Sequence, residues 1–257
     1  MYPVDLSGKK GVVLGVANDR SIAWAMATIL SQAGARLALT YQGDRLKERV
    51  TRLAGTLDGA LVLACDATDD QQIASVFEQV RDAFGDISFL VHSIAYANRE
   101  DLSGPFSETG REGFRTALEV SAYSLLPLVR HSAKLMSQGG SVVTMTFQAA
   151  QRVFPGYNVM GTAKAALEHE VRQLASEFGD RNIRVNAISA GPVETLAARG
   201  IQGFTDMKRQ HAQVAPLKRN IDVEEVAKAA LFLCSDLSSG ITGSIIPVDA
   251  GYHIMAV

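Results

Sequence analysis

Short apolar runs alternate with longer segments of helical periodicity along nearly the whole chain, and this alternation restricts the possible folds more than any other feature. Near-continuous hydrophobicity over a short run is typical of strands that are covered on both faces, as in a parallel sheet. Parallel neighbours need a crossover, which the intervening segments can supply. The expected strands lie at 11–16, 35–41, 60–66, 88–95, 141–147, 184–191 and 244–251.

The segments between these runs have the spacing of amphipathic helices, and glycines follow several of them where a helix would end. Strands and crossovers in this order predict an α/β fold: a doubly wound parallel sheet of about seven strands with helices on both faces. No linker or repeat interrupts the pattern, so we expect a single domain over 1–257. The expected helices lie at 21–33, 69–84, 111–137, 158–178 and 223–236.

Composition excludes several classes of partner. With 47% hydrophobic and 20% charged residues and a formal net charge of −2, the chain has no basic cluster for a nucleic acid. No apolar run approaches the roughly 20 residues of a membrane span, and no signal segment precedes the first strand, so we expect a cytoplasmic protein without a membrane partner. Cys65 and Cys234 are expected to be free buried thiols, and no metal site is expected because Glu168, His169 and Glu170 are consecutive on a helix.

A doubly wound sheet binds ligands at the carboxyl ends of its strands, so the residues that follow each strand are the candidates. Gly15 permits a tight turn after the first strand, and Ser21 lies at the start of a helix whose N–H groups could bind a pyrophosphate. The spacing is not G-x-G-x-x-G, and the segment is equally compatible with an ordinary strand-to-helix turn.

The next strand ends provide candidates for the adenosine half of a dinucleotide. Gln42 is neutral and suits a ribose diol, which favours NADH over NADPH, although Arg45 nearby could receive a 2′-phosphate. Asp66 could accept from an adenine amino group or cap the following helix. His92 is expected to pack at a strand end without a catalytic role. Ser93, Ile94 and Ala95 are small or flat enough to lie along the ribose.

Tyr157 and Lys164 are seven positions apart, which places them within roughly 20° on one face if the segment is helical. A lysine cation favours the charged form of a phenol and strengthens it as a donor to a developing oxyanion. Two polar residues on one helix face are common. Their position after the fifth strand of a nucleotide-type sheet is what indicates hydride transfer.

Six segments together resemble the enoyl-[acyl-carrier-protein] reductases, a divergent branch of the short-chain dehydrogenase/reductases. They are "GVANDRSIAWA", "HSIAYAN", "YNVMGTAKAALE", "RVNAISAGPVETLA", "SDLSSGITG" and "VDAGYHIM", and they run from near the start of the sequence to its end. The resemblance implies a Rossmann-like subunit, assembled as a homotetramer. It would reduce the double bond of a trans-2-enoyl thioester carried by acyl carrier protein, with NADH as cofactor.

Carried over by motif, the resemblance makes Tyr157 the oxyanion donor and Lys164 the cation that holds the nicotinamide ribose. A loop or helix at about 195–211 would cover the substrate. The implied cofactor-binding residues are Gly15, Ser21, Ile22, Gln42, Asp66, Ala67, Ser93, Ile94, Ala95, Lys164, Val193 and Thr195. The implied substrate-binding residues are Ala97, Phe147, Tyr157, Ala198, Ile201 and Phe204.

Three positions differ from the sequence motifs of the short-chain dehydrogenases or of the nearer enoyl reductases. Gly161 stands where ordinary short-chain dehydrogenases place the lysine of Y-x-x-x-K, and Phe147 replaces their serine and the second tyrosine of many nearer relatives. Glu194 stands where many relatives have a basic residue, and nothing in the sequence explains it. The alternatives are an NAD(P)H-dependent 3-oxoacyl or ketone reductase, which the spacing and Phe147 disfavour, and a non-catalytic NAD(H) sensor, which would not need Tyr157 and Lys164.

Overall fold

The computed structural model describes residues 4–195, 198 and 203–256. These residues form one parallel sheet with the strand order β3-β2-β1-β4-β5-β6-β7, which confirms the predicted fold class. The order reverses between β1 and β4, so the sheet has its topological switch point there. The strands are β1 (Lys10–Leu14), β2 (Arg36–Tyr41), β3 (Leu61–Ala64), β4 (Phe89–His92), β5 (Gly140–Thr146), β6 (Ile183–Ala190) and β7 (Ile245–Val248).

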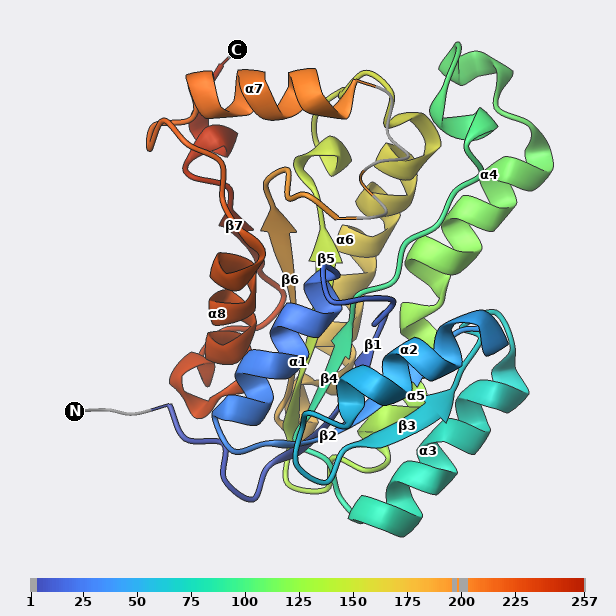
Figure 1. Cartoon of the computed structure of the whole chain (residues 1–257), viewed down its shortest axis with the longest axis vertical. Helices are drawn as coiled ribbons and strands as arrows, with labels where there is room; N and C mark the ends of the chain where they lie inside the picture. Colours follow the sequence, from blue (N-terminus) through green and yellow to red (C-terminus); the bar gives the residue numbers. More distant parts are fainter. Residues whose placement is uncertain (1–3, 196–197, 199–202, 257) are drawn as a thin grey trace.

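Successive residues of β1 bury their side chains in two separate cores, because neighbouring side chains of a strand point to opposite faces. Val13 packs in a core with α1 and α8, whereas Val12 and Leu14 pack in a core with α3, α5 and α6. Figure 1 shows α1 in front of the sheet and α6 behind it, with β5 and β6 pointing towards α7. The helices are α1 (Ile22–Gln32), α2 (Asp44–Ala54), α3 (Asp70–Phe84), α4 (Arg111–Leu118), α5 (Leu125–Ala133), α6 (Asn158–Phe178), α7 (Phe204–Val214) and α8 (Val223–Cys234).

Helix α2 was not among the expected helices, and α7 was expected only within a loop or helix at about 195–211. Of the residues described in α2, only Val50 and Ala54 are buried, and in α7 only His211 is buried. In α2, Leu46, Val50, Leu53 and Ala54 recur at helical spacing and pack against the core, as in an amphipathic surface helix. The order of apolar residues therefore does indicate a helix at α2, although this helix was not among the expected ones.

The prediction of one continuous helix over 111–137 is wrong. The chain forms α4, then a π-helical turn at Glu119–Tyr123, and then α5. Pro127 in the first turn of α5 has no N–H to continue the ladder of α4. The hydroxyl of Ser121 also donates to the carbonyl of Tyr96 and accepts from its N–H, at 3.0 and 2.9 Å, which ties this turn to the segment after β4.

Among the described residues, none of the helices has both the length and the apolar character needed to cross a bilayer.

Candidate active site

Gly15 forms a turn that brings the end of β1 against the end of β4, at the switch point of the sheet. Its φ is +98°, and a Cβ atom placed on it would lie 2.0 Å from the carbonyl oxygen of Ser93. Glycine is required here both by the positive φ and by the close backbone approach. The predicted cofactor residues Gly15 and Ser93 therefore lie side by side at the carboxyl edge.

Helix α1 begins after Ser21 without a described side chain that caps its first N–H groups. Ser21 instead donates from its hydroxyl to the carbonyl of Asn18, at 2.6 Å. In contrast, α3 and α8 are capped by Asp69 and Asp222. Because uncapped N–H groups and the helix dipole favour an anion, the start of α1 fits the pyrophosphate of a dinucleotide.

Gln42 and Asp66, the candidates at the ends of β2 and β3, contact each other. The amide of Gln42 donates to Asp66 Oδ2 at 3.0 Å, and Thr68 donates to Oδ1 from its N–H and its hydroxyl at 2.9 and 2.7 Å. Partial burial acts to raise the pKa of Asp66, but these hydrogen bonds outweigh it and lower the pKa. Asp69, not Asp66, caps α3, so Asp66 holds the turn that leads to the helix.

The other predicted cofactor residues lie on segments that follow β3, β4 and β6. Ala67, Ile94 and Thr195 are partly buried, Val193 is buried, and Ala95 is exposed. Val193 and Thr195 lie in the segment between β6 and α7, which also reaches the carboxyl edge.

Tyr157 immediately precedes the first residue of α6, so the predicted helix begins one residue after it. Its ring packs against Phe147 with ring centroids 5.0 Å apart, and Phe147 in turn packs against Phe154 at 4.7 Å. Burial raises the pKa of the Tyr157 phenol. The sequence led us to expect that Lys164 would favour the charged form, but burial decides the direction. Tyr157 therefore stays a neutral donor.

Lys164 lies two turns into α6 with a side chain that is only 4% exposed. Its ammonium donates to the carbonyl of Met145 on β5, at 2.8 Å. Burial lowers the pKa of Lys164 to about 8, and the charge of Glu168, one turn further along α6, acts in the opposite direction. Glu168 is itself buried and accepts from the hydroxyl of Thr146 at 3.0 Å. The cation is thus held at the carboxyl end of β5.

Gly161, four residues after Tyr157, lies close to the backbone of a neighbouring segment. A Cβ atom on Gly161 would lie 3.0 Å from the carbonyl oxygen of Ala149, which is tighter than ordinary packing. At this position α6 passes against the backbone of the segment after β5, so a side chain here would require a small shift of that segment. Close packing at Gly161 is therefore consistent with the departure from Y-x-x-x-K.

A cavity of about 960 Å³ lies between the Phe147–Gly156 region and α7. Of the predicted substrate residues, Phe147 lines it. Ala97, Tyr157, Ala198 and Phe204 are not among the described residues that line it. The substrate role of all five stays a prediction. Ile201 lies outside the described residues. The cavity is lined by Phe147, Arg152, Val153, Phe154, Pro155, Gly156, Pro192, Gly203, Asp206, Met207, Gln210, His211, Tyr252 and Ala256.

His211 is a lining residue that the sequence analysis missed. Its ring is 3% exposed and stacks on Tyr252 with centroids 4.5 Å apart. Neither ring nitrogen has a hydrogen-bond partner among the described residues. Burial lowers the pKa of His211, opposed by Asp249 and Asn220. No motif marked it in the sequence, because its position depends on α7 lying over the carboxyl edge.

His92 is fully buried at the end of β4, where it was expected to pack. Its Nδ1 and Nε2 hydrogen-bond the hydroxyls of Thr144 and Ser124, at 2.8 and 2.9 Å. Burial, and then the charge of Lys164, lower its pKa to about 3, so the ring is neutral. In the part of the chain that the structure describes, no group of three or more His, Cys, Asp or Glu side chains could hold a metal ion.

The family model described as "Enoyl-(Acyl carrier protein) reductase" matches residues 15–253. An enoyl-[acyl-carrier-protein] reductase [NADH] FabI from Nostoc sp. is 49% identical, over 99% of this chain and all of the relative. The Bacillus subtilis FabI is 47% identical, over 98% of both chains.

Solved structures of enoyl-acyl carrier protein reductases have the same fold as this chain. The Bacillus cereus reductase with NADP⁺ and indole naphthyridinone has a TM-score of 0.96 at 48% identity, covering 98% of this chain and 99% of its own. The Anaplasma phagocytophilum reductase with NAD has a TM-score of 0.93 at 39% identity, covering 98% and 94%. The chain therefore belongs to the enoyl-[acyl-carrier-protein] reductase family.

Proposed function

We propose that the protein reduces the carbon–carbon double bond of trans-2-enoyl thioesters carried by acyl carrier protein, with NADH as cofactor, in fatty acid synthesis. The observation that carries the proposal is the junction of β5 and α6. There a neutral Tyr157 and a buried Lys164 lie on one short segment beside a cavity that Phe147 lines. The cofactor, when bound, supplies the hydride, which adds to the β-carbon of the substrate.

Tyr157 acts on the oxygen of the thioester. Addition of hydride to the β-carbon moves negative charge to the carbonyl oxygen and forms an enolate. A proton then adds to the α-carbon, which restores the thioester carbonyl and completes the reduction. The Tyr157 hydroxyl donates a hydrogen bond to that oxygen, and a preorganised donor of this kind stabilises the transition state more than the ground state. Because burial raises its pKa, the phenol keeps its proton for this bond at neutral pH.

Lys164 holds the ribose hydroxyls on the nicotinamide side and supplies positive potential near the developing enolate. Its bond to Met145 directs the ammonium to the carboxyl end of β5. Since its pKa is lowered to about 8, the ammonium is charged at neutral pH and neutral above that range. The remaining predicted contacts, from Gly15 to Thr195, would hold the adenosine and the pyrophosphate along the same edge.

Acyl carrier protein as partner and a homotetramer as the assembly are part of this proposal. Lys208 and Arg209, which the sequence offered to an acidic carrier protein, pair with Glu194 and Asp206 of the same chain. The proposal that acyl carrier protein is the partner therefore rests on family membership. Exposed aromatic rings at Phe106, Phe114 and Tyr123 offer apolar surface that a second copy could cover. The single-domain organisation and the cytoplasmic location stay predictions.

The test is NADH oxidation by the purified protein, followed by the loss of NADH absorbance. A short trans-2-enoyl thioester is compared with the matching 3-oxoacyl thioester. Turnover of the enoyl substrate alone is expected. Turnover of the 3-oxoacyl thioester instead would refute the proposal in favour of a ketone reductase.

A further inference from the structure

Helix α7 borders the cavity of about 960 Å³ but has little buried attachment of its own. Four of its residues line the cavity: Asp206, Met207, Gln210 and His211. Of the 11 residues in the helix, only His211 is buried. How firmly α7 lies over the carboxyl edge therefore depends chiefly on this one side chain.

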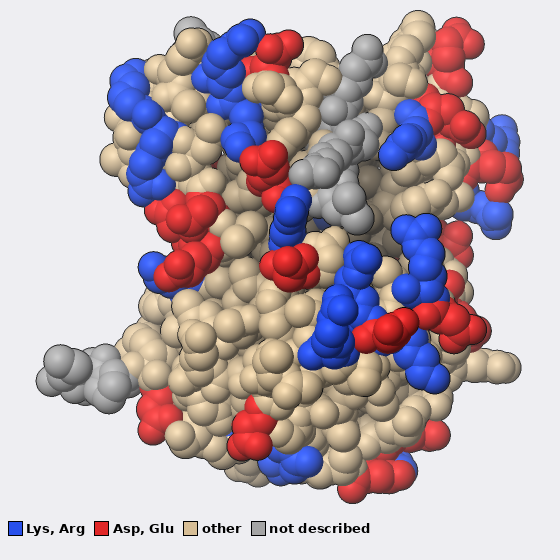
Figure 2. Space-filling model, viewed as in Figure 1, with Lys and Arg blue, Asp and Glu red and all other residues tan. Residues whose placement is uncertain are grey.

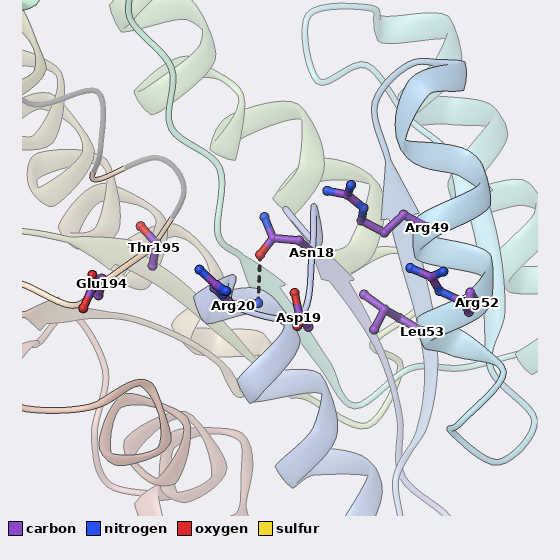
Figure 3. A pocket seen from close by; sticks show the side chains of 8 residues that line it. All are labelled: Asn18, Asp19, Arg20, Arg49, Arg52, Leu53, Glu194 and Thr195. Carbon is purple, nitrogen blue, oxygen red and sulfur yellow. Dashed lines mark hydrogen bonds between the residues drawn. The ribbon is translucent and has the colours of Figure 1, made fainter.

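The outer face of α7 carries surface ion pairs. Arg209 pairs with Asp206 of the same helix at 2.7 Å, and Lys208 pairs with Glu194 at 3.2 Å. Figure 2 shows basic and acidic side chains close together at this end of the molecule. Glu194 belongs to the segment after β6 and borders a smaller cavity of about 370 Å³ beside Arg20 (Figure 3). Water and salt screen largely exposed pairs of this kind, so they hold the helix only weakly.

The inner face of α7 has the spacing of an amphipathic helix except at its most buried position. Phe204 and Met207 are half-buried and stand seven and four residues before His211, and Val214 is half-buried three residues after it. An apolar residue at 211 would complete this face. The histidine that stands there buries both ring nitrogens without a partner in the part of the chain that the structure describes. Because unpartnered buried nitrogens are destabilising, the packing of α7 does not by itself account for this histidine.

The groups that face the His211 ring come from three neighbouring segments. The ring stacks on Tyr252 with centroids 4.5 Å apart and 22° between the ring planes. A Cβ atom on Gly191 would lie 3.1 Å from Nε2, so the ring also lies against the backbone after β6. Asp249, after β7, and Asn220, before α8, act to raise the pKa of His211, but burial is the larger effect and lowers it. The site therefore favours a neutral ring.

Asp249 is the acidic group beside His211, and its carboxylate has other partners. It accepts from the N–H of Gly251 at 3.0 Å and from the N–H of His253 at 2.8 Å. Nδ1 of His253 hydrogen-bonds the same carboxylate at 2.9 Å. Among the described residues, no hydrogen bond joins Asp249 to His211, and the other charged residues of α7 are those in the surface ion pairs. A protonated His211 would thus be buried without a bonded counter-charge.

We propose that His211 is a positioning residue whose protonation loosens α7 from the carboxyl edge and so weakens binding of the acyl substrate. The inference rests on the proposed function, because it takes the cavity beside α7 as the substrate site. When α7 is seated, burial holds the pKa of His211 below its ordinary value of 6.5; when α7 is released, the ring is solvated and titrates near that value. The helix therefore stays seated above pH 6.5, and a fall in pH through 6.5 shifts the population towards the released form.

The test measures kcat and KM for a medium-chain trans-2-enoyl thioester at saturating NADH, between about pH 7.5 and about pH 5.5. In the wild type KM should rise about three- to tenfold as pH falls, since only the seated fraction binds well. The value of kcat should change less than about twofold, because saturating substrate seats the helix. This range lies below the pKa of about 8 of Lys164, whose ammonium stays charged throughout.

Two variants at position 211 remove the titration. His211→Phe keeps a ring that can stack on Tyr252, and His211→Leu completes the apolar face; both should keep the wild-type high-pH KM over the whole range. His253→Gln is the matched control, because it removes the other histidine beside Asp249. It should still show the rise in KM at low pH. A profile that is flat in His253→Gln but not in His211→Phe would assign the response to His253 and overturn the inference.

Hydrogen exchange of the α7 amides without substrate gives a readout that does not depend on turnover. The wild type should exchange faster than His211→Phe at about pH 5.5 and equally at about pH 7.5, each pair being compared at one pH so that intrinsic rates cancel. A wild-type KM that is constant, or that falls at low pH, would overturn the inference. A KM raised by the same factor at every pH in both 211 variants would show a purely structural role and would also overturn it. Absence of enoyl turnover would refute the proposed function, while the exchange comparison would still test the His211 anchor.

Discussion

Replacing Glu168 by glutamine should move the alkaline limit of activity to lower pH. Lys164 is buried, and the charge of Glu168 acts to raise its pKa against that burial. Charges about 6 Å apart, a typical spacing one helical turn along, interact by about 3 kcal/mol at an effective dielectric of about 20, equivalent to about two pKa units. Glutamine keeps an oxygen that accepts from Thr146, so the packing of the side chain is retained.

The Lys164 ammonium is charged below its pKa and neutral above it, so the wild type should lose cofactor binding as pH rises through about 8. In Glu168→Gln the pKa should fall by about one to two units, and at pH 7.5 kcat/KM for NADH should be about tenfold lower than in the wild type. Below the lowered pKa the two proteins should converge. The assay is kcat/KM for NADH against pH, which reports the pKa values of the free enzyme.

Glu177→Gln is the matched control, because Glu177 lies on the same helix but is exposed. It should have the wild-type pH profile. An alkaline limit that stays in place in Glu168→Gln would refute the electrostatic link between Glu168 and Lys164. A rate that is lower by the same factor at every pH would instead indicate a purely structural role for Glu168.

Three further outcomes are expected. Tyr157→Phe should lower kcat about 100- to 1000-fold, through loss of the oxyanion donor, with the NADH dissociation constant from fluorescence titration unchanged; a normal kcat would exclude that role. Gly15→Ala should lower both Tm and NADH affinity, since its Cβ would lie 2.0 Å from the Ser93 carbonyl oxygen; an unchanged Tm would contradict the contact. A hydrogen bond from Arg219 lowers the pKa of Glu225 from 4.5 to about 2, so its stabilisation is present above pH 4.5 and lost as pH falls towards 2. Acid unfolding of Glu225→Gln should show less pH dependence in that window.

The strongly periodic parts of the sequence were sufficient to predict their structures. The runs at 141–147 and 184–191 became β5 and β6, and the helix expected at 158–178 is α6. These elements bury apolar side chains on one or both faces, so burial leaves its period in the sequence. The same reasoning placed Tyr157 and Lys164 at the carboxyl edge, because the end of a parallel strand and the start of the next helix meet there.

Other features were not predicted. Apolar residues of α2 recur at helical spacing, and Pro127 marks the start of α5, so these two signals were present in the sequence. The hydrogen bonds between Ser121 and Tyr96, which tie the turn between α4 and α5 to the segment after β4, left no such signal. His211 enters its cavity only because α7 crosses the edge of the sheet. The contacts of Ser121 and His211 join residues far apart in the chain, which no short window of sequence records.

The sequence by itself determined which strands and helices alternate, which glycine must turn at the end of β1, and which tyrosine and lysine share the start of α6. Those properties follow from side-chain periodicity and backbone sterics, which act between near neighbours. Only the tertiary structure decided the protonation states of Tyr157 and Lys164. Burial raises the pKa of Tyr157 and lowers that of Lys164, and burial is a property of the packed molecule.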